Sequence, residues 1–142
     1  MTDEPVAILS EEESWKRLGS VFLGRLVTSF AGEPEIFPVN FVVQGHTVLF
    51  RTAEGTKLFS AVAHRTVVFE ADDHTAAQGW SVILRGRAKV LQTQAEIAEA
   101  ERAQLLPWTA TLKVHYVRVT PSEITGRQFA FGPEPDRGST FA

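Results

Sequence analysis

Polar side chains gather at one chain reversal, in the stretch RTAEGTKL that runs from 51 to 58. Around its glycine stand two cations and two hydroxyls: Arg51, Thr52, Thr56 and Lys57. A turn needs the glycine, but it does not need this set of hydrogen-bond donors. Thr56 stands where the N-cap of a helix is expected, so the backbone N–H groups after it carry partial positive charge. The stretch predicts a site for a doubly charged anion such as a phosphate, and a solvated turn explains the same residues equally well.

Other chemistry finds less support in the sequence. The stretch is not a Walker A loop, because the order G-x-x-x-x-G-K-[ST] is absent. The chain has no cysteine, which excludes disulfides, thiol nucleophiles and cysteine-ligated zinc. Its four histidines show no i,i+4 pair, so no metal site is predicted. No Ser-His-Asp set or pair of carboxylates stands out, and the catalytic residues stay unknown.

A second unusual stretch is EIFPVNFVV at 35–43. Its alternating residues give one face with Phe37, Val39, Phe41 and Val43 and another with Ile36, Pro38, Asn40 and Val42. A proline in a strand indicates an edge or a bulge, where backbone groups are free to bind something else. Asn40 adds a donor and an acceptor to an apolar face, which would suit a flat heterocycle with hydrogen-bonding edges. An edge strand with a surface asparagine is the simpler interpretation.

Composition favours one ordinary globular domain of 142 residues, with 44% hydrophobic and 22% charged residues. The net charge of −3 argues against nucleic acid as the main partner. No apolar run approaches the ~20 residues of a membrane helix. The N-terminus lacks the basic and apolar blocks of a signal peptide. We therefore expect a cytoplasmic protein with no membrane or nucleic-acid partner.

Strands dominate the pattern that must position these residues. Strand-like runs occur at 21–30, 35–43, 46–52, 65–71, 80–91 and 111–121, with 123–131 as a candidate last strand. Helical patterns occur at 10–19, 56–64 and 93–106. About six antiparallel strands with short flanking helices predict a mainly β, α+β fold that closes into a barrel, because closure hides the edges. We expect a single domain at 1–131 and a mobile C-terminal tail at 132–142.

In their order and spacing these stretches resemble the FMN-binding split-barrel superfamily of pyridoxamine 5′-phosphate oxidase-like proteins. The resemblance covers nearly the whole chain and includes LSEEESWKRLGSVFLGRL, PEIFPVNFVV, TVLFRTAEGTKL, HRTVVFEAD, GWSVILRGRAKVL and VRVTPSEITGRQ. It implies a six-stranded antiparallel split β-barrel that forms a homodimer with two FMN molecules at its interface.

The resemblance also implies roles for particular residues. The phosphate ligands would be Arg51, Thr52, Thr56 and Lys57. The isoalloxazine would lie against Pro38, Val39, Asn40 and Phe41. The longest strand would approach the flavin at Trp80 and Ser81, and Arg127 would lie in a C-terminal segment that reaches the flavin of the partner subunit.

The sequence departs from true pyridoxamine phosphate oxidases, which carry an Arg-x-His segment near the C-terminus. Here GRQFAF stands instead, so vitamin B6 oxidation is not expected. The chain looks like the small actinobacterial-type members, and we expect an FMN-dependent oxidoreductase acting on a small organic substrate.

Several alternatives stay open. The chain could be a flavin or haem binding or sensing module without turnover, an interaction barrel with a vestigial pocket, or a deazaflavin-dependent reductase. A deazaflavin carries a long acidic tail. Arg85, Arg87 and Lys89 alternate along one strand face and could either receive such a tail or form a solvated basic face.

Overall fold

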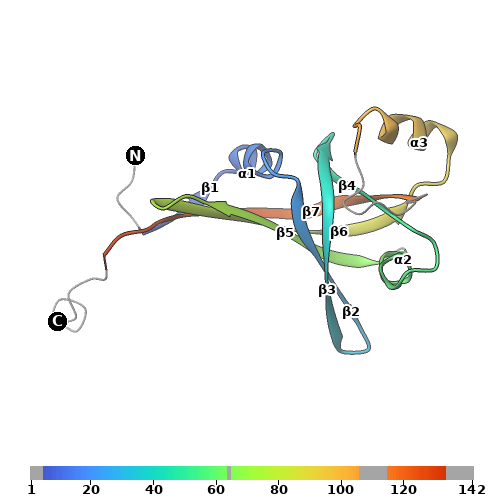
Figure 1. Cartoon of the computed structure of the whole chain (residues 1–142), viewed down its shortest axis with the longest axis horizontal. Coiled ribbons are helices and arrows are strands. Elements are labelled where there is room, and N and C mark those ends of the chain that lie inside the picture. The colour runs from blue at the N-terminus through green and yellow to red at the C-terminus, as the bar shows by residue number, and fades with distance from the viewer. Residues whose placement is uncertain (1–4, 64, 106–114, 134–142) are drawn as a thin grey trace.

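An antiparallel sheet that closes on itself organises the chain, as the computed structural model shows (Figure 1). The structure describes residues 5–63, 65–105 and 115–133. The strands are β1 (Val6–Leu9), β2 (Leu23–Phe30), β3 (Glu33–Gln44), β4 (Thr47–Thr52), β5 (Thr66–His74), β6 (Gln78–Val90) and β7 (His115–Ala130). The helices are α1 (Glu11–Leu18), α2 (Lys57–Val62) and α3 (Gln94–Glu101). The strand order is β1-β7-β4-β3-β2-β5-β6, and a β6–β7 pairing closes the barrel.

The barrel confirms the predicted fold class, with two differences in its strands. The sheet has seven strands rather than six, because the unpredicted β1 pairs with the end of β7 at Val6↔Phe129. The described parts of the predicted strands 111–121 and 123–131 lie in one continuous strand, β7, which runs from His115 to Ala130. The interruption between them is a bulge, where Arg85 pairs with Glu123 and the next residue, Gly86, pairs with Pro121. The residues 111–114, the helix end at 106 and the tail from 134 lie outside the described part of the chain.

Alternation along the strands fills the barrel with apolar side chains. Phe41 and Phe69 meet edge to face at the centre, with ring centroids 4.7 Å apart. Helix α1 covers the barrel with the buried residues Trp15 and Leu18. Its N-cap is the predicted Ser10, whose side chain accepts a hydrogen bond from the backbone N–H of Glu13 at 3.1 Å. A smaller apolar cluster joins α3 to the outside of β4 through Leu49, Leu91, Ala100 and Leu105.

Strand β3 leaves the barrel partway along its length. It pairs with β2 from Glu33 to Asn40, but its pairing with β4 begins only at Phe41. Pro38 therefore lies on a stretch that has no β4 partner, which confirms the predicted edge and explains how the sheet tolerates a proline there. The β2–β3 hairpin extends beyond the rest of the sheet, and α2 lies beside it (Figure 1).

We expect Gly86→Ala to destabilise the protein by about 1–3 kcal/mol, because the structure leaves no room for a side chain at this position. A Cβ on Gly86 would lie 2.2 Å from the backbone oxygen of Thr120, and backbone cannot move aside as a flexible side chain can. Gly132→Ala is the matched control, because nothing lies within 4 Å of its Cβ position. Chemical unfolding of both variants measures the difference, and equal stabilities would contradict the close approach at the bulge.

Candidate functional site

The two threonines of the predicted phosphate site meet at the start of α2. The hydroxyl oxygens of Thr52 and Thr56 lie 3.2 Å apart. Thr56 is the N-cap, as predicted: its hydroxyl accepts from the N–H of Phe59 at 3.1 Å and donates to the carbonyl of Ala53 at 2.7 Å. Thr52 is fully buried. Both hydroxyls therefore hold the local turn together in addition to any role toward a ligand.

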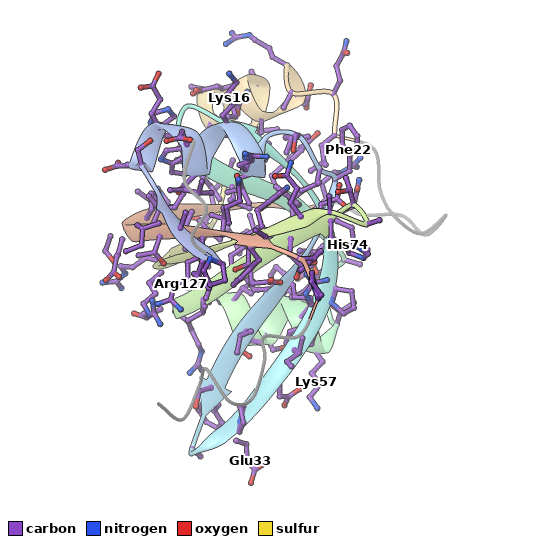
Figure 2. The ribbon with its side chains drawn as sticks, turned by 90° about the vertical axis from the view of Figure 1, so that its left-hand side faces the viewer. Lys16, Phe22, Glu33, Lys57, His74 and Arg127 are labelled. Carbon is purple, nitrogen blue, oxygen red and sulfur yellow. The ribbon has the colours of Figure 1, made fainter. Side chains whose placement is uncertain are left out.

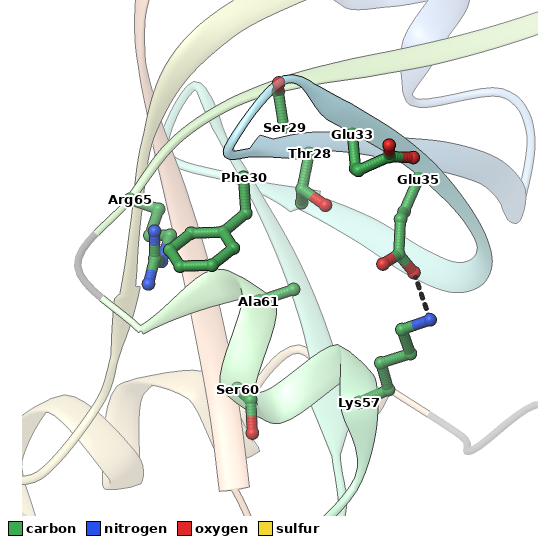
Figure 3. A pocket seen from close by; sticks show the side chains of 9 residues that line it. All are labelled: Thr28, Ser29, Phe30, Glu33, Glu35, Lys57, Ser60, Ala61 and Arg65. Carbon is green, nitrogen blue, oxygen red and sulfur yellow. Dashed lines mark ion pairs between the residues drawn. The ribbon is translucent and has the colours of Figure 1, made fainter.

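The two cations of this site turn to different neighbours. Lys57 is 74% exposed and its ammonium forms an ion pair with Glu35 on β3, at 2.9 Å (Figure 3). The guanidinium of Arg51 lies over the ring of Tyr116 on β7, 5.3 Å from its centroid. The structure thus places Lys57 toward the β2–β3 hairpin and Arg51 toward the β4–β7 side of the same loop.

The predicted ring-binding residues divide between the two faces of the sheet. Val39, Phe41 and Trp80 point into the core and are almost fully buried. A ligand could reach these three only through their backbone groups. Pro38, Asn40 and Ser81 lie at alternate positions on the other face, where Pro38 is exposed and Asn40 and Ser81 are half-buried.

Strand register brings the outward-pointing residues into two adjacent rows. In the first row Pro38 pairs with Arg25, which pairs with Glu70. In the second row Asp72 pairs with Ser81, which pairs with Arg127. We call the side of the sheet on which these six residues lie the outer face. Arg127 lies apart from Lys57 on the molecule (Figure 2).

A charged cluster occupies the middle of the outer face. Arg25 donates from Nε to Glu70 at 2.7 Å and from Nη2 to Asp72 at 2.7 Å. Burial, together with a hydrogen bond to Asp72, raises the pKa of Glu70 to about 7. The same hydrogen bond from Glu70 lowers the pKa of Asp72. The pair can therefore hold one proton near neutral pH and release it just above.

Sequence reasoning missed this cluster. Its signal was the alternation in FEADD, which places Glu70 and Asp72 on one face of a strand whose other face is apolar. Arg25 is the partner, and it lies more than forty positions earlier in the chain, as the separation of 45 to Glu70 shows. Only the β2–β5 pairing brings the three together.

The remaining sequence candidates lie on ordinary surface. Arg85, Arg87 and Lys89 are exposed. Lys89 pairs with Glu96 on α3 at 3.1 Å, and Arg85 lies 3.8 Å from Glu123. Within the described ranges, no group of three His, Cys, Asp or Glu residues could hold a metal ion. No helix in that part of the chain is long and apolar enough to cross a membrane.

Comparisons with known proteins find a matching family model and similar sequences. A family model described as pyridoxamine 5′-phosphate oxidase matches residues 10–128. An uncharacterised protein of Mycobacterium tuberculosis is 73% identical over 101 residues, which cover 71% of this chain and 92% of that protein.

Two solved structures are also close. A FAD binding protein from Mycobacterium smegmatis is 57% identical with a TM-score of 0.81, and the match covers 88% of this chain and 99% of that one. A Corynebacterium glutamicum protein, provisionally named a pyridoxamine 5′-phosphate oxidase, is 48% identical with a TM-score of 0.85. The match covers 94% of this chain and 100% of that one.

We expect Glu70→Gln to change how stability depends on pH. Glu70 has a pKa of about 7 in the folded chain against an ordinary 4.5, so its stabilising contribution is complete below pH 4.5 and is lost as the pH rises through 7. The amide keeps the shape and cannot titrate. Thermal unfolding between pH 4.5 and 8 should show the wild type losing stability relative to the variant as the pH rises.

Glu12→Gln on the exposed part of α1 is the matched control for this experiment and should keep the wild-type pH dependence. Curves for wild type and Glu70→Gln that run parallel through this window would contradict the shared proton.

Proposed function

This chain belongs to the pyridoxamine 5′-phosphate oxidase family, and from that membership we propose that it binds a flavin nucleotide and works as a flavin-dependent oxidoreductase on a small organic substrate. The observation that carries the proposal is the 57% identity, over 88% of the chain, to the FAD binding protein of Mycobacterium smegmatis. At that similarity the outer face and the loop before α2 are expected to serve the same kind of ligand.

The flavin ring is proposed to lie on the outer face, against Pro38, Asn40 and Ser81. Two features support this position. The stretch of β3 around Pro38 has no β4 partner, so backbone N–H and C=O groups on that edge can bond the edge of the ring. Pro38 is exposed, and the side chains of Asn40 and Ser81 are half-buried rather than packed into the core, which leaves the three residues accessible to a flat ligand.

The phosphate is proposed to lie near the loop that precedes α2. Lys57 is its best-placed ligand, because its ammonium is exposed and reaches Glu35 on β3, the strand whose unpaired edge is proposed to bond the ring. Glu35 lies on the opposite face of β3 from Pro38 and Asn40, so the ligand would pass around that edge. Thr52 and Thr56 fix the loop, and Arg51 completes its positive charge. Binding would require the ammonium of Lys57 to share or exchange its ion pair with Glu35.

Two flavins, FMN and FAD, are candidates for the ligand, and they share the FMN portion. The sequence predicts FMN, whereas the Mycobacterium smegmatis protein is a FAD binding protein. Both ligands contain the FMN portion, so both fit the placement of ring and phosphate proposed above. A deazaflavin is less well supported, because its acidic tail needs a track of cations and two of the three cations on β6 already face carboxylates.

A second copy of the chain is proposed to cover the outer face and to complete the site. Strand register places four exposed apolar side chains on the same side of the sheet as Pro38 and Arg127: Val6, Ile8, Leu23 and Ile36. The most exposed of the four is Ile8, at 86%. An apolar surface of this kind is typical of an interface. Two-fold homodimers are the commonest soluble assembly.

A bound flavin would supply the electron or hydride transfer itself. The chain's own residues would anchor the phosphate, bond the ring edge and exclude water from the outer face. Glu70 is the described residue best suited to hold or release a proton there, because its pKa is near 7. A carrier or sensor without turnover would use the same anchoring residues and no proton transfer.

The proposal is tested by the spectrum of the purified protein and the mass of the small molecule released from it. A flavin spectrum with FMN or FAD released supports binding, and a well-folded protein that binds neither flavin would overturn it. Turnover of a reduced nicotinamide with a panel of quinones or nitro compounds supports the oxidoreductase. Flavin binding without any reoxidation by these acceptors would favour the carrier.

We expect Lys57→Ala to weaken FMN binding by about ten- to a hundredfold, since a charge-assisted bond contributes roughly 1.5–3 kcal/mol. Glu35→Gln should strengthen binding, because it releases the ammonium of Lys57 from its ion pair. Lys16→Ala, an exposed lysine on α1, is the matched control and should bind FMN as the wild type does. Fluorescence titration measures all four proteins, and wild-type affinity in Lys57→Ala would remove Lys57 from the site.

We expect a homodimer in sedimentation at micromolar concentration, and we expect Ile36→Asp to produce monomers that bind flavin more weakly. The charge would sit on the outer face, where the second copy is proposed to pack. Phe22→Asp is the control, because Phe22 is equally exposed but precedes β2. A monomeric wild type with tight flavin binding would rule out the completed interface.

A further inference from the structure

A cavity opens between the tip of the β2–β3 hairpin and helix α2 (Figure 3). Its volume is about 230 Å³. The walls combine an aromatic ring, two carboxylates, two cations and small or hydroxyl side chains: Thr28, Ser29, Phe30, Glu33, Glu35, Lys57, Ser60, Ala61 and Arg65. We propose that this cavity is a binding subsite for adenosine, the second half of a flavin adenine dinucleotide. The proposal rests on the flavin binding proposed above and extends it from the proposed phosphate position at Lys57 to the tip of the β2–β3 hairpin.

The aromatic wall is suited to a nucleobase. Phe30 is 67% exposed, and the apolar core does not account for its position at the end of β2. The guanidinium of Arg65 lies over its ring, 4.8 Å from the centroid, and Figure 3 shows the ring projecting from the hairpin toward α2. Phenylalanine rings and arginine planes are the groups on which unpaired bases stack. An adenine therefore finds both kinds of stacking surface at one wall.

The polar wall is suited to a ribose. Glu33 and Glu35 can accept hydrogen bonds from sugar hydroxyls, and Ser60 can donate or accept one. The two carboxylates are balanced by Lys57 and Arg65, so the cavity carries no net formal charge. A neutral nucleoside can enter it without meeting an uncompensated field.

Lys57 connects the cavity to the proposed phosphate position. It is a wall of the cavity, and it is also the best-placed phosphate ligand of the FMN portion. In a flavin dinucleotide the adenosine follows the FMN phosphate through a single further phosphate. The cavity thus begins where the FMN portion is proposed to end, on the side toward the hairpin.

The volume of the cavity also suits one portion of a ligand rather than a whole ligand. Pockets that hold a whole drug-sized ligand measure ~300–1,000 Å³, and this cavity is smaller. A nucleoside attached to a ligand that is anchored elsewhere needs only a partial enclosure. A free substrate or a segment of a second chain copy are the other possible occupants, and the experiment separates them.

The test is a titration of the full chain with FMN and with FAD in parallel. We expect the wild type to bind FAD about tenfold more tightly than FMN, the scale of one base stacked on an aromatic ring. Phe30→Ala should lower FAD affinity about tenfold and leave FMN affinity unchanged. Phe22→Ala, which removes a ring of similar exposure from outside the cavity, should change neither affinity.

A second variant keeps the test independent of any loss of folding in Phe30→Ala. Ala61→Leu adds bulk to the α2 wall and should remove the preference for FAD while FMN binds as before. AMP should compete with FAD and not with FMN on the wild type, which identifies the adenosine as the recognised part.

Each outcome bears on a different proposal. Equal loss of FMN and FAD affinity in Phe30→Ala, or no loss of either, overturns the adenosine subsite, as does a wild type that binds FMN without preferring FAD. Equal loss together with dissociation into monomers would assign the cavity to a second copy instead. A folded wild type that binds neither flavin overturns the proposed function itself, and the subsite with it.

Discussion

Closure of the barrel through the β6–β7 pairing is the constraint on which the rest of the structure depends. In a closed sheet each residue points either into the core or outward, and a shift of one position exchanges the two sets. The bulge between Arg85 and Gly86 adds one residue to β7 and changes its register relative to β6. Beyond the bulge Ser81 lies opposite Arg127 and both point outward, while Trp80 and Val82 point into the core. The outer face exists in its present form because this one irregularity sets the register.

The departure of β3 from the barrel has the opposite effect, since it opens the sheet where closure would leave no room for a ligand. The strand supplies Val39 and Phe41 to the core, and its first part, from Glu33 to Asn40, pairs only with β2. That stretch carries Pro38 at an unpaired edge and, in the hairpin, one side of the cavity against α2. The ion pair between Lys57 and Glu35 ties the two sides together. Strand β3 therefore contributes residues to the core, an unpaired edge that is proposed to bond the flavin ring, and one wall of the cavity.

Local sequence signals predicted the parts of the structure that local interactions determine. The caps of α1 and α2 at Ser10 and Thr56, and the edge at Pro38, follow from side chains within a few residues of each other. The missed features depend on distant pairing. Strand β1 is short and gains its partners only from β7, and Arg25 meets Glu70 and Asp72 only through the order of the sheet. Lys57 was predicted as a phosphate ligand, but its ion pair with Glu35 was not predicted, because Glu35 comes from a neighbouring hairpin whose position the turn sequence does not reveal.

The outer face combines two properties, a carboxyl pair in which Glu70 is half-buried and Asp72 exposed, and a border of exposed apolar side chains. Glu70 already has a raised pKa with one side of the sheet exposed. Covering the face with a ring and a second copy would remove further water, and desolvation disfavours the charged form of a carboxyl group. Arg25 opposes this effect with two hydrogen bonds and keeps one negative charge on the pair. In the covered state the cluster would thus approach a neutral set, one guanidinium balanced by one shared negative charge with a proton between the carboxyls. Such a set can lie beneath an uncharged aromatic ring system without an unpaired charge, and it still holds a proton that the ligand can reach.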